Sequence, residues 1–493
     1  MRNPSLLASG LAVLLAGCWI DPVEVSPSAP PAATPAVPVA APVPADRSAS
    51  GACPLLEPAA LEAMGFTVRW HSEVKASTPV HLYLGEHVCY LETAESTVHA
   101  IDRQDGYYRW IHPLRGPLQV PPGEGDGVAY FASSSVLDAV DLGTGKVDWT
   151  QRLPFRPVTE PAANDFYLGM GASDGSVYAF RLRESDPKAP GGFRVTHDLL
   201  WHWSVGNPLQ APPVLPRDAA EQMLGVGGNG ELESRALPDG RTRWRYPYHG
   251  AMGPVRGAVA YDLLSLSGQE RPERALLVGS LDHHLLALDP QGGTLLASYL
   301  ATDAIEVKPL VLSYVKPGVT PDWTVVRETY CLSLDGRLAC LRTEDAHKAK
   351  RDASGAPLLD DKKRPQWLSE EEDGDDVYGG ESEEAARPAG DPAEDGAIRR
   401  PVRRPLHWEL RCLWTADDVA RVICRGRSGI YVQGRDGRLR LLDESGRERW
   451  SRSLEGVAAL SANPSNPFRE GAEDPSLYLL DAHGIVWCLE EKR

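Results

Sequence analysis

The stretch Ala100-Ile101-Asp102-Arg103-Gln104-Asp105-Gly106-Tyr107-Tyr108-Arg109-Trp110 decides the fold, because its pattern recurs along the chain. The segment Ala139–Trp149 matches it without a gap, with Ala, Asp, Gly and Trp at the same spacing. A third copy, 287–297, carries Ala297 where the Trp would fall. Two weaker copies are Ser234–Trp244 and Leu442–Trp450, the latter one residue shorter before its Gly. A pattern that returns at a fixed period predicts a repeat architecture.

An alternating apolar run precedes each copy, as in 128–131 and 429–432, and a turn such as Asp174-Gly175 often follows the run. Each unit therefore contains strands joined by a hairpin turn and a Gly turn, and ends at Trp. The interval from Trp110 to Trp149 is 39 residues. This length suits a four-stranded antiparallel meander, and a series of such units predicts an all-β β-propeller.

Eight units follow from counting central strands, which predicts an eight-bladed propeller. They lie around Ala100, Ala139, Ala179, Ser234, Ala287, Ala339, Leu441 and Trp487. Seven blades is the alternative, because the sixth unit is interrupted and ends at either Trp408 or Trp414. The last unit lacks its final strand, and the segment 65–70 ends in a matching Trp70. We expect this N-terminal strand to complete the last blade and close the ring, which removes exposed sheet edges.

The N-terminus predicts export and lipid attachment. Residues 1–17 have a basic start and a short apolar run, as in a signal peptide. They end in Leu15-Ala16-Gly17 before Cys18, which resembles a bacterial lipobox and implies lipidation at Cys18. The alternative is an ordinary signal peptide with an incidental Cys. Trp19, rather than Asp, follows the Cys. By the enteric sorting rule this favours the outer membrane, with the protein facing the periplasm.

Three further segments follow from composition. Residues 18–60 are rich in Pro and Ala and are predicted to form an extended stalk. Residues 61–493 are assigned to the propeller, and 343–405 to a charged insertion within it. Between Glu370 and Asp395 the insertion carries 12 acids and one base. Such a run favours a solvated, disordered loop, with an electrostatic docking arm or a Ca²⁺ site as alternatives.

The repeat resembles the quinoprotein-type (PQQ-like) propeller repeat, whose Ala-x-Asp-x3-Gly-x3-Trp core is a tryptophan-docking motif. In that family each Trp packs between blades against the Ala and Gly of another copy. By this resemblance the structural docking residues are Ala100, Asp102, Gly106, Trp110, Ala139, Asp141, Gly145, Trp149, Trp244, Ala287, Asp289, Gly293 and Trp450. Lipobox, stalk and eight such blades together are similar to the BamB-type lipoproteins of the outer-membrane β-barrel assembly machinery.

One disulfide has a geometric argument. Asp335-Gly336 is typical of a two-residue hairpin turn, which would place Cys331 directly opposite Cys340, close enough for a cross-strand bridge. The alternative is two buried thiols. Seven cysteines remain after Cys18, so at least one is free or pairs elsewhere.

No motif supports catalysis. Quinoprotein dehydrogenases commonly carry two adjacent cysteines beside the quinone, and this chain has none. The adjacent His283 and His284 would face opposite sides of a strand, which disfavours a shared metal. We therefore expect no catalytic residue, no cofactor and no metal. A net charge of −17 disfavours nucleic acid.

The sequence therefore predicts a lipid-anchored, non-catalytic scaffold that binds proteins through its blade-connecting loops. The resemblance implies the barrel-assembly machinery as partner. The alternatives are a PQQ-dependent oxidoreductase and a ligand-sensing or adhesion propeller.

Overall fold

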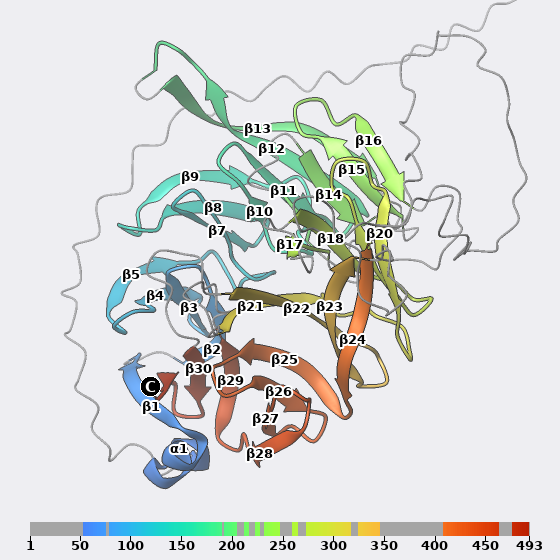
Figure 1. The fold of residues 1–493 in the computed structure, drawn as a ribbon. Coiled ribbons are helices and arrows are strands. Elements are labelled where there is room, and N and C mark those ends of the chain that lie inside the picture. The colour runs from blue at the N-terminus through green and yellow to red at the C-terminus, as the bar shows by residue number, and fades with distance from the viewer. Residues whose placement is uncertain are drawn as a thin grey trace, which may run out of the picture. The chain divides into compact units, whose positions relative to one another are not determined.

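The computed structural model describes most of the chain beyond residue 52 (Figure 1). The described residues are 53–74, 78–189, 192–204, 212–215, 222–226, 231–246, 259–264, 273–316, 324–345, 408–462 and 476–492. They all lie in one compact unit, Ala41–Arg493. The lipobox with Cys18, most of the predicted stalk and nearly all of the insertion fall outside the described residues.

The strands form eight antiparallel sheets, which are the eight blades of a β-propeller. Blade 1 comprises β2 (Pro79–Leu84), β3 (Val88–Thr93), β4 (Thr97–Asp102) and β5 (Tyr108–Pro113). Blade 2 comprises β6 (Gly123–Gly125), β7 (Val128–Ser133), β8 (Val136–Asp141) and β9 (Val147–Arg152). Blade 3 comprises β10 (Ala162–Ala163), β11 (Tyr167–Gly171), β12 (Ser176–Ser185) and β13 (Phe193–Ser204).

Blade 4 has three described strands, β14 (Gln222–Val226), β15 (Leu232–Ala236) and β16 (Thr242–Tyr246), and Val214 forms a bridge with Leu224 in the place of a fourth. Blade 5 comprises β17 (Ala260–Leu264), β18 (Glu273–Gly279), β19 (His284–Leu288) and β20 (Leu295–Leu300). Blade 6 comprises β21 (Leu310–Lys316), β22 (Thr324–Leu332), β23 (Leu338–Asp345) and β24 (Trp408–Ala416). Blade 7 comprises β25 (Val419–Arg425), β26 (Ile430–Gly434), β27 (Leu439–Leu442) and β28 (Glu448–Arg452).

Blade 8 joins the two ends of the folded chain. It contains β29 (Val457–Ala462), β30 (Ser476–Asp481) and β31 (Ile485–Glu491), and β1 (Phe66–Glu73) pairs antiparallel with β31 as its outer strand. Lys492 N also donates to Gly65 O at 2.7 Å. The predicted eight blades and the closing N-terminal strand are therefore confirmed.

The apolar core lies between neighbouring blades. One cluster contains Tyr90 and Trp110 of blade 1 and Phe131 and Val140 of blade 2, and each of these side chains is buried. The central strands β3 and β7 are apolar on both faces because each face meets a different neighbouring blade. Burial between blades, rather than within one sheet, therefore holds the ring together.

Every outer strand carries a β-bulge at the same place. In β5, Trp110 pairs with Ala100 while Tyr108 pairs with Ile101, so Arg109 is the extra residue. The equivalent extra residues elsewhere are Arg69, Asp148, Leu200, Arg243, Leu296, Leu413 and Arg449. A bulge bends the strand and redirects the next side chain. Here the next position is that of the docking Trp, so the bulge turns it toward the adjacent blade.

The propeller domain begins near residue 53, before the predicted boundary at residue 61. A 3₁₀ turn, η2 (Pro54–Leu56), and a helix, α1 (Pro58–Met64), lie in the segment 53–64, most of which we expected in the stalk. Leu55, Leu61 and Met64 are buried in the same apolar cluster as Trp487 of blade 8. Because these apolar side chains pack into the core of blades 7 and 8, the segment belongs to the propeller.

The predicted pairing of Cys331 with Cys340 is wrong. Gly336 N donates to Ser333 O, and Ser333 N donates to Arg337 O, so the turn has three residues rather than two. This shifts the register by one: Cys331 pairs with Ala339, and Cys340 pairs with Tyr330. A shift of one residue sends the two side chains to opposite faces. Both are buried free thiols in different clusters, as the alternative held.

Thiol counting checks this assignment. Of the seven cysteines among the described residues, six are buried and only Cys412 is exposed. Burial raises the pKa of Cys331 to about 12, which suppresses its thiolate further. We expect one rapidly reacting thiol per native chain, absent in Cys412→Ser, and seven thiols beyond Cys18 after denaturation without reductant. A count of five would indicate a disulfide and contradict the structure.

Candidate protein-binding surfaces and the sites that support them

The predicted docking residues meet between blades. Trp244 of blade 4 packs on Gly293 of blade 5, where a Cβ on the glycine would lie 2.5 Å from Trp244 Cε3. The indole Nε1 of Trp244 also donates to Pro290 O at 3.1 Å. Gly293 has φ +68°, a conformation that side-chain-bearing residues rarely adopt. The glycine thus provides both the turn and the space for the ring.

The same contact recurs around the ring, at the turn between the third and fourth strands of a blade, which we call the docking turn. The glycine partners of the docking tryptophans are Gly106 for Trp70, Gly145 for Trp110, Gly240 for Trp201 and Gly446 for Trp414. Three of these indoles donate to backbone carbonyls, Trp70 to Arg103, Trp110 to Leu142 and Trp201 to Leu237, at 2.7–3.0 Å. Trp414, not Trp408, is therefore the docking Trp of blade 6.

The Asp of the motif shapes the docking turn. Asp102 accepts from Gln104 N, Asp141 from Thr144 N and Asp289 from Gly292 N, at 2.6–2.9 Å. Asp side chains commonly bond to backbone N–H groups two or three residues ahead in turns. The Ala of the motif lies directly opposite its own Trp, as in Ala139 and Trp149, and leaves room beside the indole.

Two docking turns depart from the pattern, and the preceding blade changes with them. Blade 3 has a long β12–β13 hairpin in place of the Gly turn, and Trp149 of blade 2 stacks on His197 at 5.4 Å instead. The other departure is in blade 6, where the insertion replaces the turn. Blade 5, which precedes blade 6, carries Ala297 at the position of the docking Trp. Trp408 and Leu410 of β24 pack beside Ala297 in the space that an indole would fill.

Trp450 also differs from its prediction. In blade 8 the third and fourth strands, β31 and β1, are not consecutive in the chain. Gly65 precedes β1 at φ +75°, but a Cβ on it would meet nothing within 4 Å, so Trp450 does not pack on it. Trp450 instead packs against the cluster that contains Leu61, Met64 and Phe66. The helix α1 therefore covers the position that a docking turn occupies in other blades.

Glycine substitution tests the docking contact. In Gly293→Ala the new methyl group meets Trp244, whereas in Gly437→Ala, at φ +77°, it meets open space. Both changes carry the cost of a side chain at positive φ, about 1–2 kcal/mol. We expect Gly293→Ala to be about 1–3 kcal/mol more destabilising in urea unfolding, because it also overpacks the interface. Equal losses would mean that the indole does not depend on this glycine.

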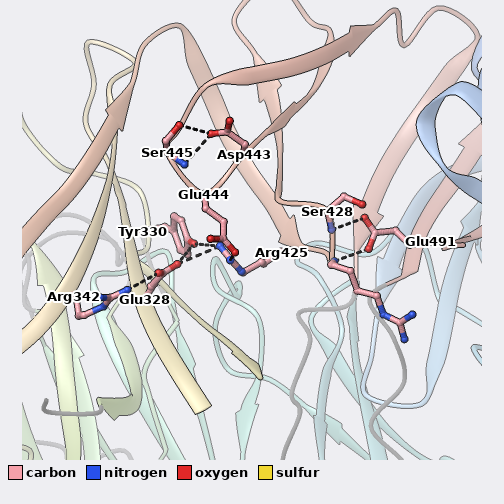
Figure 2. A network of polar contacts seen from close by, with 10 residues as sticks. Glu328, Tyr330, Arg342, Arg425, Ser428, Asp443, Glu444, Ser445 and Glu491 are labelled. Carbon is pink, nitrogen blue, oxygen red and sulfur yellow. Dashed lines mark hydrogen bonds and ion pairs between the residues drawn. The ribbon is translucent and has the colours of Figure 1, made fainter. Parts of the chain in front are cut away.

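A buried polar network joins blades 6 and 7 (Figure 2). Arg425 Nη1 of β25 donates to Glu328 Oε2 at 3.2 Å and to Tyr330 Oη at 3.1 Å. Tyr330 Oη donates to the same carboxylate oxygen, and Arg342 donates to the other. Glu444 lies 3.7 Å from Arg425 Nη2. Burial raises the pKa of Tyr330 far above its usual range, so the phenol remains a donor.

Carboxylates also hold loops of neighbouring blades. Glu491 accepts from Ser428 N of blade 7 (Figure 2). It also accepts from Arg427 N and Tyr431 Oη of the same blade. Glu124 does the same for blade 1, accepting from Glu86 N at 2.6 Å and Tyr90 Oη at 2.5 Å. Both oxygens of Glu328, Glu491 and Glu124 accept hydrogen bonds. These networks satisfy the buried carboxylates and link neighbouring blades.

Removing one partner of the buried ion pair tests this interpretation. Arg425 and Glu328 side chains are each 5% exposed. We expect Arg425→Met to lower the free energy of unfolding by about 1–3 kcal/mol, because Glu328 loses its buried cationic donor. Arg342 and Tyr330 still donate to Glu328 in this variant. The double variant with Glu328→Gln should recover part of the loss. Arg194→Met, at an exposed pair, is the control and should cost less than about 1 kcal/mol.

Three large apolar side chains are exposed at the end of blades 5 and 6 where the blade-connecting loops lie. They are Leu300, Val307 and Leu334, which we call the loop patch. The two segments that carry them are joined, since Leu334 N donates to Ala304 O at 2.9 Å and Thr302 donates to Asp335 at 2.7 Å. Arg435 of blade 7 donates to Leu334 O as well. The loop patch is therefore held by bonds from three blades, and nothing in the sequence pattern signalled it.

The β12–β13 hairpin is the second exposed feature (Figure 1). Its outer strand exposes Phe193, Val195 and Leu199. The repeat pattern does not show which side chains this hairpin exposes.

The described residues contain no group of three His, Cys, Asp or Glu side chains that could hold a metal ion. His283 lies in a turn at φ +73° and His284 begins β19, so the pair is not part of one strand as we expected. In the part of the chain that the structure describes, no helix has the length and apolar character to cross a membrane.

Comparisons with known proteins agree with the repeat. A family model described as "Outer membrane protein assembly factor BamB" matches residues 59–255. The crystal structure of BamB from Moraxella catarrhalis is similar over 86% of this chain and 99% of its own, with 13% identity and a TM-score of 0.50. Quinohemoprotein alcohol dehydrogenase from Comamonas testosteroni is similar over 87% of this chain and 77% of its own, with 11% identity and a TM-score of 0.49. No curated protein matches the sequence. The chain is a β-propeller whose repeat resembles the PQQ-like repeat, and its fold is similar to that of BamB.

Proposed function

We propose that this chain is a lipid-anchored, non-catalytic scaffold that faces the periplasm at the outer membrane and binds subunits of the barrel-assembly machinery. Cys18 is the proposed site of lipidation, and residues 18–52 the proposed stalk. The role in outer-membrane protein assembly comes from the family model that matches residues 59–255. The observation that carries protein binding is the loop patch.

The loop patch has the properties of a contact surface. Leu300 is 65% exposed and Leu334 is 45% exposed, although each lies on a segment fixed by hydrogen bonds. A rigid apolar surface loses little conformational entropy when a partner covers it. Arg337 and Asp417 form an ion pair at 2.8 Å near the same turn, which supplies the polar surroundings typical of a protein interface.

The buried acids support a non-catalytic role. Each of the interblade carboxylates Glu124, Glu328 and Glu491 is engaged by donors on both oxygens, so it serves packing between blades. A general base needs an oxygen that can reach substrate. These groups therefore stabilise the scaffold on which the loop patch is displayed.

Affinity capture from native membranes tests the partner. We expect the full-length chain to retain barrel-assembly subunits, and the double variant Leu300→Lys/Leu334→Lys to lose most of them, because charges would face an apolar partner. Ile111→Lys, an exposed apolar position on β5, is the matched control and should bind normally. Capture that lacks any barrel-assembly subunit would contradict the proposed role.

A cofactor experiment tests the non-catalytic part. We expect the purified chain, incubated with pyrroloquinoline quinone and Ca²⁺, to bind no quinone and to reduce no dye with alcohols or sugars. Quinone absorbance that remains after gel filtration, together with dye reduction, would establish an oxidoreductase instead.

A further inference from the structure

The outer strand of blade 3 differs from those of the other blades. β13 has twelve residues, while β5, β9 and β20 have six each. It is the last strand of its sheet, and no described strand pairs with its outer side. A long outer strand presents a row of backbone N–H and C=O groups that can pair with another strand.

The hairpin is fixed to the body of the blade, so its outer edge is preformed. Leu182 N donates to Phe166 O at 2.7 Å, and Phe166 and Phe193 pack edge to face at 5.3 Å. Thr196, which is buried, donates to Arg181 O at 3.0 Å. Arg183 pairs with Asp126 of blade 2. These contacts order both strands well beyond the position where other blades make their docking turn.

Three charged side chains near the tip of the hairpin pair with one another. Glu184 accepts from Arg194 at 2.7 Å and from Arg181 at 3.3 Å. Charged side chains on an edge strand normally discourage pairing with other chains. Here Arg194 and Glu184 are paired within the hairpin, whereas Asp198 of β13 is an exposed carboxylate that forms no ion pair among the described residues, next to the exposed apolar Leu199.

The exposed apolar side chains of β13 lie on both faces of the strand. Val195 pairs with Arg183 and Leu199 with Phe180, and these two residues of β12 point to opposite faces. Val195 is 64% exposed and Leu199 is 44% exposed. A strand added beside β13 would therefore cover Phe193 and Val195 on one face and Leu199 on the other. The exposed Asp198 disfavours an acidic segment, and its apolar neighbours favour a β-forming segment whose side chains are apolar or uncharged on both faces.

We propose that the outer edge of β13 binds an extended, uncharged β-forming segment of a partner protein by strand addition to blade 3. The proposal rests on the protein-binding function proposed above, but it uses a different surface from the loop patch. Backbone hydrogen bonds supply affinity in this mode, and side chains such as Val195 supply selectivity. A client that has not yet folded, with unpaired strands of this composition, fits the edge.

A peptide experiment tests the edge directly. The probe is a fluorescent twelve-residue peptide of alternating Val and Thr with a Lys at each end. The control peptide replaces two central Val by Pro, which removes backbone donors and disfavours pairing. We expect saturable binding of the first peptide to the full-length chain by fluorescence anisotropy, and at least tenfold weaker binding of the second.

Variants of the chain locate the site. Val195→Lys/Leu199→Lys should weaken peptide binding at least tenfold, whereas Val147→Lys, at an exposed position on β9, should leave it unchanged. Because all three side chains are exposed, we expect unchanged thermal midpoints. Hydrogen exchange on the unmodified chain gives a readout independent of variants: peptide should slow exchange in residues 193–199.

Three results would overturn the proposal: no binding, equal binding of the Pro-containing peptide, or protection confined to other blades. Self-association through β13, seen in sedimentation and lost in the double variant, would also overturn it by making a second copy the occupant. If the peptide fails while Leu300→Lys/Leu334→Lys still loses barrel-assembly subunits, the proposed function stands without this edge. If the peptide binds at β13 while Leu300→Lys/Leu334→Lys still retains the barrel-assembly subunits, the edge stands and the loop patch is not the binding surface.

Discussion

The contact between a tryptophan and the docking-turn glycine of the next blade is the constraint on which the ring depends. It needs a bulge that redirects the indole, a small residue opposite it, and a glycine at positive φ that leaves space for it. The Trp110 indole satisfies a backbone carbonyl at Leu142 at the same time. The Ala and Trp of one blade and the Asp and Gly of the next thus form one interaction across two blades.

Blades 3 and 6 show what happens when one half of that contact is lost. In blade 6 the docking turn is replaced, the preceding blade carries Ala297, and Trp408 enters the gap from the other side. In blade 3 the hairpin grows outward and His197 meets Trp149. A propeller can lengthen a loop at this position only if something else fills the space between the blades. In both blades, a lengthened turn is therefore accompanied by a side chain that fills the space between the blades.

The repeat pattern was sufficient to predict the blade number and the closing strand, because both follow from periodic side chains. It could not predict the pairing of Cys331, since a turn of two or three residues depends on backbone geometry that Asp-Gly alone does not determine. The role of Trp408 depended on a contact with another blade. The apolar loop patch was invisible for a different reason: exposure of Leu300 is a property of the surrounding surface, whereas an apolar residue in a strand normally indicates burial.

The residues that the repeat pattern predicts build the ring, and the exposed residues that it does not predict are available for recognition. Interblade carboxylates such as Glu328 and Glu491 accept hydrogen bonds from neighbouring blades, and the docking tryptophans pack against glycine turns. The surfaces left over are those the repeat does not specify: the loop patch and the edge of β13. Because the ring is held by contacts that recur between neighbouring blades, one docking turn can be replaced by a long hairpin while the others keep the blade positions. A propeller of this kind can therefore acquire binding surfaces one blade at a time, provided that each new hairpin also packs against the tryptophan it displaces, as His197 does.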